Sequence, residues 1–227
     1  YKVYKTLTGH SLKVSSLAVL PDNNRLASGS DDKTIKIWNV TSGHVIRTLT
    51  GHSGEVRSLA VFPDGKLASG SEDKTIKIWN LRTGEVIRTL TGHINSIESI
   101  AVLKDGLFAS GSADSTIGIW NADTGRVVRS LIGHSSAIFS LAALSDNRLA
   151  SGSYDQEIKI WNLTTSMVIR TLTGHSEAIW SLAALPDNRL ASGSEDNTIK
   201  IWDLKTGEVI RTLNGHSNSV YSLAVLK

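Results

Sequence analysis

The sequence has 227 residues, of which 40% are hydrophobic and 20% are charged, and its formal net charge is +3 at pH 7. This balance predicts one folded domain, because disordered chains carry fewer apolar residues and a larger net charge. The lack of cysteine excludes disulfides, zinc–thiolate centres, iron–sulfur clusters and cysteine nucleophiles.

No apolar run approaches the roughly 18 residues that a membrane span needs, and the N-terminal stretch lacks the apolar core of a signal peptide. We therefore expect a cytoplasmic protein that does not enter a membrane. The chain opens at Tyr1 and its only methionine is Met167, which predicts a segment of a longer protein. The 24 basic residues face 21 acidic ones without a block of like charge, so the sequence gives little support for nucleic-acid binding.

One sequence unit recurs along the chain, and five of the six tryptophans, all but Trp180, are spaced 41 residues apart. In the second unit, β-type runs over residues 56–62, 67–71, 75–81 and 86–91 are separated by turns rich in Asp, Gly and Asn. No window repeats apolar residues with the period of about 3.6 that a helix needs. Four short strands in every unit predict an all-β fold, a propeller of four-stranded antiparallel blades.

The units resemble WD40 repeats over essentially the whole chain, because each runs from Gly-His through about 27 residues to Trp-Asn or, at Trp202, Trp-Asp. Their near identity resembles the highly repetitive WD40 propellers of bacteria such as cyanobacteria. The resemblance implies a single domain over residues 1–227, with five complete blades and a partial sixth formed by residues 3–8 and 220–226. A blade without its middle strands predicts either a longer propeller or self-association through the open edge.

Each full unit carries a serine, a histidine and an aspartate beside its tryptophan, as in His52, Ser69, Asp73 and Trp79. A catalytic triad also needs an oxyanion hole and a substrate pocket, and five equal copies favour a structural role, so no catalytic residue is assigned. The WD40 resemblance implies a buried hydrogen-bond chain from the indole through serine and histidine to aspartate, although Ser71 lies on the same strand face as Ser69. A metal ion needs several ligands around one point, whereas each unit has one such histidine and the units lie apart. Neither a metal nor a cofactor is therefore expected.

Two further positions recur between and within the outer strands. Glycines at 43, 84, 125 and 207 indicate a left-handed turn, in which Ser166 replaces glycine in the fourth unit. Arginines at 47, 88, 129, 170 and 211 fall on the fourth strand, and we expect them to be solvated edge charges that discourage sheet-to-sheet pairing.

Positions that differ among nearly identical units are candidates for partner binding. The clearest lies five residues after the Gly-His histidine, and the WD40 resemblance places it on the innermost strand, at one mouth of the central channel. Tyr154, in a turn that the family places on the same side, extends this set. The six residues, called the ring residues below, are Ser15, Arg57, Glu98, Phe139, Trp180 and Tyr221.

Aromatic residues and arginine dominate protein-binding hot spots, so we expect a non-enzymatic scaffold that binds a protein or peptide at the ring residues. Three alternatives stay open. The aromatic residues could plug the channel of a purely structural propeller segment with no specific ligand. One Ser-His-Asp set could serve a hydrolase, or the aromatic residues could stack on nucleic-acid bases, although no basic groove accompanies them.

Overall fold

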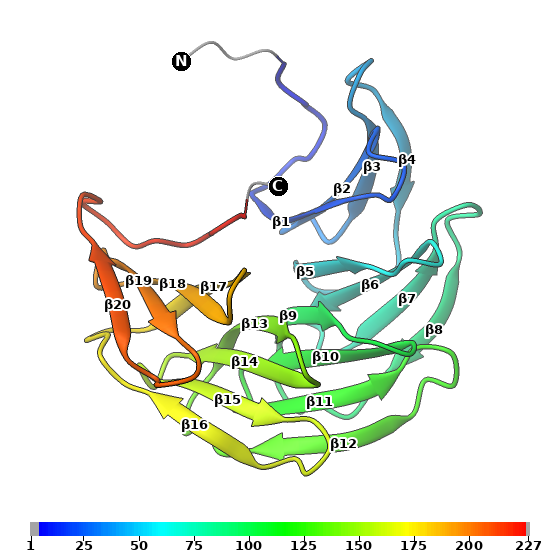
Figure 1. Cartoon of the computed structure of the whole chain (residues 1–227). Helices are drawn as coiled ribbons and strands as arrows, with labels where there is room; N and C mark the ends of the chain where they lie inside the picture. The colour runs from blue at the N-terminus through cyan, green and yellow to red at the C-terminus, as the bar shows by residue number, and fades with distance from the viewer. Residues whose placement is uncertain (1–4, 226–227) are drawn as a thin grey trace.

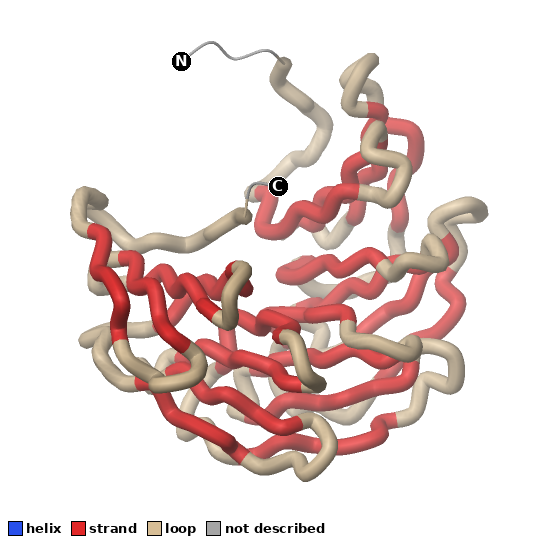
Figure 2. Tube along the Cα trace, in the orientation of Figure 1, coloured by secondary structure: helices blue, strands red, loops and turns tan. Residues whose placement is uncertain are grey.

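The computed structural model describes residues 5–225. Five four-stranded antiparallel sheets follow one another along the chain, and each keeps its strands in sequence order. Figure 1 shows the sheets arranged radially as the blades of a propeller, with the first strand of each blade nearest the centre and the fourth outermost. No helix occurs in the described part of the chain, and Figure 2 shows only strands and loops there.

Strand bounds repeat from blade to blade. Blade 1 contains β1 (Val14–Val19), β2 (Arg25–Ser30), β3 (Ile35–Asn39) and β4 (Val45–Leu49). Blade 2 contains β5 (Val56–Val61), β6 (Lys66–Ser71), β7 (Ile76–Asn80) and β8 (Val86–Leu90). Blade 3 contains β9 (Ile97–Val102), β10 (Leu107–Ser112), β11 (Thr116–Asn121) and β12 (Val127–Ile132). Blade 4 contains β13 (Ile138–Leu144), β14 (Arg148–Ser153), β15 (Ile158–Asn162) and β16 (Val168–Leu172), and blade 5 contains β17 (Ile179–Leu185), β18 (Arg189–Ser194), β19 (Ile199–Asp203) and β20 (Val209–Leu213).

The hydrophobic core lies between the blades, where sheets pack face to face. Four clusters each join one blade to the next, and in the first of them Ile35 and Ile37 of blade 1 pack with Leu67 and Trp79 of blade 2. The sheets approach closely at a glycine in each second strand: a Cβ on Gly70 would lie 2.5 Å from the side chain of Ile97. The apolar residues on the facing sides of neighbouring blades therefore fix the radial arrangement.

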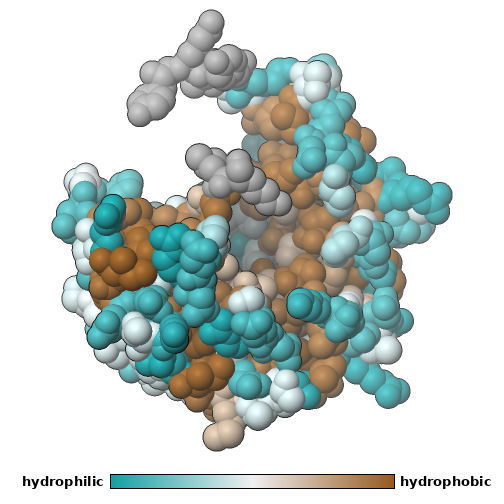
Figure 3. Space-filling model, viewed as in Figure 1, coloured by the Kyte–Doolittle hydropathy of each residue, from teal (hydrophilic) through white to brown (hydrophobic). Residues whose placement is uncertain are grey.

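The arc of blades is open between blade 5 and blade 1 (Figure 1). Leu17 is 61% exposed on the free face of blade 1, whereas the equivalent Leu59 and Leu182 are 8% and 9% exposed between blades. Val19 is also exposed there, and Figure 3 shows hydrophobic residues gathered on the blade 1 side of the opening. No neighbouring sheet covers this face among the described residues.

The predicted partial sixth blade differs from the structure. Residues 5–8 and 220–225, the described parts of the predicted segments, form no strand, because the two middle strands that would pair with them are lacking. The remaining positions of those segments lie outside the described residues. Val220 nevertheless takes the place that Val56 has in blade 2: it is buried against Gly193, and its amide donates to the carbonyl of Ser194 over 2.9 Å.

Arginines of the fourth strands connect neighbouring blades, which the sequence did not predict. Arg47 Nη1 donates to the carbonyl of Thr83 over 2.5 Å, and Arg170 Nη1 donates to the carbonyl of Thr206 over 2.6 Å. Arg129 Nη1 donates to the carbonyl of Leu163, two positions earlier in the corresponding turn. Three of the five predicted edge charges are thus bound to the outer turn of the following blade, since those turns leave carbonyl groups without a ladder partner.

Candidate functional site

A hydrogen-bonded chain of four side chains crosses the interior of every blade. In blade 2, Trp79 Nε1–H donates to Ser69 Oγ over 2.7 Å, and Ser69 Oγ lies 2.7 Å from His52 Nε2. His52 Nδ1 lies 2.8 Å from Asp73 Oδ2, and since a carboxylate only accepts, this nitrogen is the donor. The second serine, Ser71, instead bonds to the amide of Asp73 over 3.1 Å. The five sets, called the tetrads below, are His10, Ser28, Asp32 and Trp38; His52, Ser69, Asp73 and Trp79; His93, Ser110, Asp114 and Trp120; His134, Ser151, Asp155 and Trp161; and His175, Ser192, Asp196 and Trp202.

The tetrad serines lie out of reach of a substrate. Ser28 is 3% exposed and the other four are fully buried, and each hydroxyl already accepts an indole N–H. A nucleophile needs an open path to the substrate as well as a base. The tetrads therefore stabilise the blades and contribute no hydrolytic site.

The tetrad carboxyls are held in their charged form. Burial by itself raises the pKa of Asp73, but hydrogen bonds from Thr75, from His52 and from the amide of Ser53 outweigh it and lower the pKa to about 2. Burial lowers the pKa of His52 below its ordinary 6.5, against the opposing effect of Asp73. The neutral imidazole thus accepts from serine at one nitrogen and donates to aspartate at the other.

Five of the six ring residues stand at a backbone irregularity that every blade repeats. The register between first and second strands shifts across Ser15, Arg57, Glu98, Phe139 and Trp180, so each is the extra residue of a β-bulge. A bulged residue has no partner on the neighbouring strand, and the bulge changes the direction of its side chain. The blade therefore imposes no cross-strand partner at this position, which is consistent with its variation among units.

All six ring residues line one cavity of about 840 Å³. Lys13, Val14 and Ser222 complete its wall. This cavity, called the hollow below, is open to solvent and bordered by the first strands of all five blades and by the segment that follows blade 5. The structure thus brings the six positions together, while their role in binding a partner stays a prediction.

One side of the hollow is aromatic. The rings of Phe139 and Trp180 stack with centroids 4.2 Å apart and an interplanar angle of 24°. Tyr221 lies 5.3 Å from Trp180 and Tyr154 lies 6.2 Å from Phe139, so the four predicted aromatic residues form one continuous cluster. The Nε1 atom of Trp180 is buried without an acceptor in the described residues, unlike the indole nitrogens of the tetrads.

The other side of the hollow is polar and charged. Arg57 pairs with Glu55 over 2.5 Å and lies 3.7 Å from Asp31. The hydroxyl of Ser15 donates to Asp31 over 2.7 Å, and the hydroxyl of Ser96 donates to Glu98. The hollow therefore presents a charged side and an aromatic side to any molecule that enters it.

Sequence reasoning missed Lys13, Glu55 and Ser96, which lie two residues before the ring residues of their units. This second column also varies along the chain, reading Lys13, Glu55, Ser96, Ala137, Ala178 and Ser219. Its variation was visible in the sequence and could have identified these residues. Glu55 and Ser96 each bind the ring residue of their own unit, so the two columns act together.

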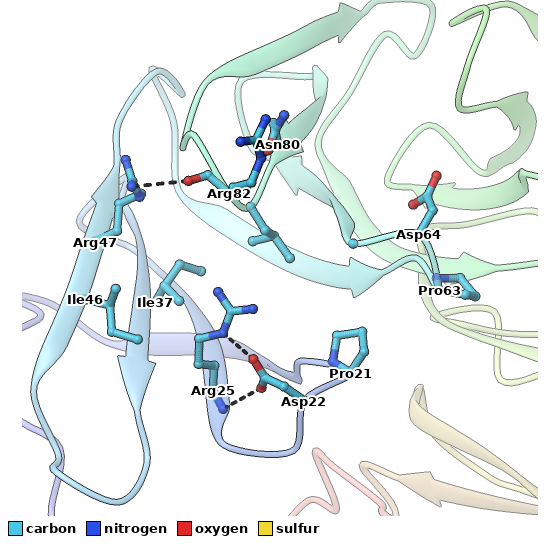
Figure 4. Close-up of a pocket in the computed structure, with 12 residues that line it drawn as sticks. Pro21, Asp22, Arg25, Ile37, Ile46, Arg47, Pro63, Asp64, Asn80 and Arg82 are labelled. Atoms are coloured by element: carbon cyan, nitrogen blue, oxygen red, sulfur yellow. Dashed lines mark hydrogen bonds and ion pairs between the residues drawn. The ribbon is translucent and has the colours of Figure 1, made fainter.

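A second cavity, of about 670 Å³, lies between blades 1 and 2 and contains none of the ring residues (Figure 4). Its Arg25 pairs with Asp22 over 2.5 Å, and Arg47 bonds to backbone carbonyls of the next blade, as the figure shows for Arg82. Asp64 pairs with Lys66 outside the set drawn. The charges around this cavity are thus largely satisfied within the protein.

Neither a metal centre nor a spanning helix is found in residues 5–225. No group of three or more histidine, cysteine or acidic residues is arranged to hold a metal ion there. No described segment forms a helix of the length and apolarity needed to cross a membrane.

Comparison with known proteins identifies the repeat unit. The model of the WD domain, G-beta repeat, matches residues 1–39, 43–80, 84–121, 125–162 and 166–203. A solved structure described as "Structure of U3-55K" superimposes with a TM-score of 0.88 and 26% identity, over 92% of this chain and 67% of that one.

Three similar curated proteins each match a stretch of about one repeat. The vegetative incompatibility protein HET-E-1 of Podospora anserina is 59% identical over 39 residues, which are 17% of this chain and 3% of that protein. The pre-mRNA-splicing factor PRP46 of Yarrowia lipolytica is 46% identical over 43 residues, 19% of this chain and 10% of that protein. The ribosome biogenesis protein BOP1 homolog of Drosophila virilis is 51% identical over 39 residues, 17% of this chain and 5% of that protein. The chain thus spans a tenth or less of each of these relatives, and its five matched repeats and five blades show that it belongs to the WD40 repeat family.

Proposed function

We propose that this chain is a non-enzymatic scaffold that binds a protein or peptide in the hollow. WD40 repeat domains generally act as scaffolds for protein interaction, which fits this proposal. The observation that carries it is the convergence of all six ring residues on one cavity. Every blade supplies one of them from a bulge on a rigid strand, and preorganised side chains lose little conformational entropy on binding.

The chemistry of the hollow suits a peptide. Aromatic residues and arginine bury large surface areas on binding and lose little rotamer freedom. The polar side of the hollow offers hydrogen-bond partners for the backbone or the side chains of a peptide. The relatives named for pre-mRNA splicing and ribosome biogenesis suggest a place in a multiprotein assembly, and this is carried over to the chain only as part of the proposal.

Selection from a displayed library of random peptides tests the proposal. We expect peptides to be enriched on the wild-type chain and lost when Phe139, Trp180 and Tyr221 are all replaced by alanine. The matched control replaces Ile132, Met167 and Ile169, three exposed apolar side chains of the outer strands and turns, and should keep the selected peptides. If the hollow variant keeps its blades, as judged by cooperative unfolding, and still captures the same peptides, the proposed site is wrong.

Three narrower expectations join the proposal. Cytoplasmic location and kinship with the repetitive bacterial propellers stay predictions. Self-association through the incomplete blade stays one as well, and the exposed Leu17 and Val19 on the free face of blade 1 support it. Light scattering after gel filtration tests it, because a concentration-independent mass of 24.4 kDa contradicts self-association.

A further inference from the structure

The charged side chains of the hollow differ in their partners. Its wall contains two cations, Lys13 and Arg57, and one carboxylate, Glu98, while Asp31 and Glu55 lie beside Arg57. Arg57 lies between Glu55 and Asp31 and is therefore neutralised by this chain's own residues. Glu98 has a different environment: it accepts from the hydroxyl of Ser96, and no cation pairs with it within 4.0 Å among the described residues. Among the described residues, the carboxylate of Glu98 thus lines the hollow without an ion-pair partner.

The unpaired carboxylate stands beside the aromatic cluster. Glu98 and Phe139 occupy the same bulge position in adjacent blades, and Phe139 continues into Trp180 and Tyr221. The faces of aromatic rings carry negative potential and attract cations, with Trp the strongest. Both the carboxylate and the rings therefore favour positive charge where the charged side of the hollow meets the aromatic side.

We propose that the hollow binds the guanidinium group of a peptide arginine, with its plane against the aromatic cluster and its N–H groups donated to Glu98. This inference rests on the proposed function and names the ligand of that same site. Phe139 and Trp180 already stack at 4.2 Å, so the guanidinium lies against the cluster and not between these two rings.

Arginine fits this pair of features better than other side chains. Its guanidinium is planar, weakly hydrated and forked, so it stacks on a ring and pairs with a carboxylate at the same time. Lysine shares the charge but presents no plane to the rings. A neutral side chain leaves Glu98 without a counter-charge, and an acidic one is repelled by it.

Titration with two matched peptides tests the inference. The probes are blocked glycine pentapeptides with either arginine or citrulline, its neutral isostere, at the centre, and the readout is the NMR shift of the indole N–H signals. Cation–π contact and a charge-assisted hydrogen bond together predict at least tenfold tighter binding of the arginine peptide. The lysine peptide should bind with intermediate affinity.

Two variants locate the preference. Glu98→Gln should bring the arginine peptide close to the citrulline peptide, whereas Glu85→Gln, a carboxylate on an outer turn, should leave the preference unchanged. Equal binding of the two peptides to the wild type, no binding of either at millimolar concentration, or an undiminished preference in Glu98→Gln overturns the inference.

The result is separable from the proposed function. If library peptides bind the wild type, are lost in the triple alanine variant and show no preference for arginine over citrulline, the hollow is a binding site but not one for guanidinium. If the triple variant keeps its library peptides, the proposed function itself fails.

Discussion

The tetrads and the ring residues lie in the same blades and follow opposite rules. Every tetrad has the same four residue types and the same bonds, and its indole and serine are buried between strands. The ring residues differ in every unit and line an open hollow, and the five that lie in complete blades stand at bulges without a ladder partner. The difference teaches that backbone pairing separates the uniform positions from the variable ones: the serine and tryptophan of each tetrad lie on paired strands, whereas the variable residue of each blade lies at an unpaired bulge, where the partner site is proposed.

The largest expected effect contrasts two tryptophans. Trp161 is 1% exposed and bound to Ser151, whereas Trp180 is half-buried at the hollow. We expect Trp161→Ala to lower the free energy of unfolding by about 3–5 kcal/mol, the usual cost of deleting a large buried ring. Trp180→Ala should cost about 1 kcal/mol, because mainly stacking is lost. Urea unfolding measures both, and equal losses would remove the distinction between the two regions.

The second contrast uses two serines. Ser151→Ala should lower stability by about 2 kcal/mol, because the indole of Trp161 and the imidazole of His134 lose their buried partner. Ser15→Ala removes only a partly buried bond to Asp31 at the hollow and should change stability by less than about 0.5 kcal/mol. Urea unfolding measures the loss of stability in both variants. A loss in Ser15→Ala as large as that in Ser151→Ala would show that the hollow also stabilises the fold.

Acid should weaken the tetrads in two stages. Burial lowers the pKa of His52 and His175 in the folded chain below the unfolded value of 6.5. The unfolded chain therefore binds more protons than the folded chain as the pH falls below 6.5. The free energy of unfolding, which has its full value above that pH, decreases as the pH falls through this range. A second loss follows between the unfolded aspartate pKa of 3.8 and about 2, the pKa of Asp73 and Asp196 in the folded chain. Denaturant midpoints against pH measure both stages. A midpoint that rises on acidification contradicts the assignment.

The smallest expected effect is a gain at Ser166. This residue occupies the turn position of Gly84 with φ +62°, and its amide bonds to the carbonyl of Asn162 over 2.9 Å, as that of Gly84 does to Asn80. Ser166→Gly should therefore raise stability by up to about 1 kcal/mol, by relieving a left-handed conformation. Gly84→Ser is the reverse control and should destabilise, because a Cβ there would lie 2.5 Å from Arg47. A loss of stability in Ser166→Gly would show that the serine is not strained.

The repeated part of the molecule was predictable because each unit confirms the others. Period, strand order and the hydrogen-bond chain from Trp79 to Asp73 follow from residues that recur in register. The structure also decides between Ser69 and Ser71, which share one strand face and could not be separated by alternation alone.

The unrepeated part was predictable only in outline. Variation pointed to the ring residues, but the bulge that aims them is a backbone feature that no residue type marks. The bonds from Arg47 and Arg170 to the next blade depend on how two blades approach each other, and a pattern within one unit contains no such information. The predicted sixth blade differed because its strands were inferred from likeness to other units, while a strand forms only where a partner strand is present.

The bulge also makes the molecule a practical platform for directed evolution. Five codons, one for each blade, encode side chains that converge on one cavity and have no ladder partner on the neighbouring strand. Randomising them together yields a combinatorial repertoire of paratopes on an unchanged framework, with every clone sharing the same buried tetrads.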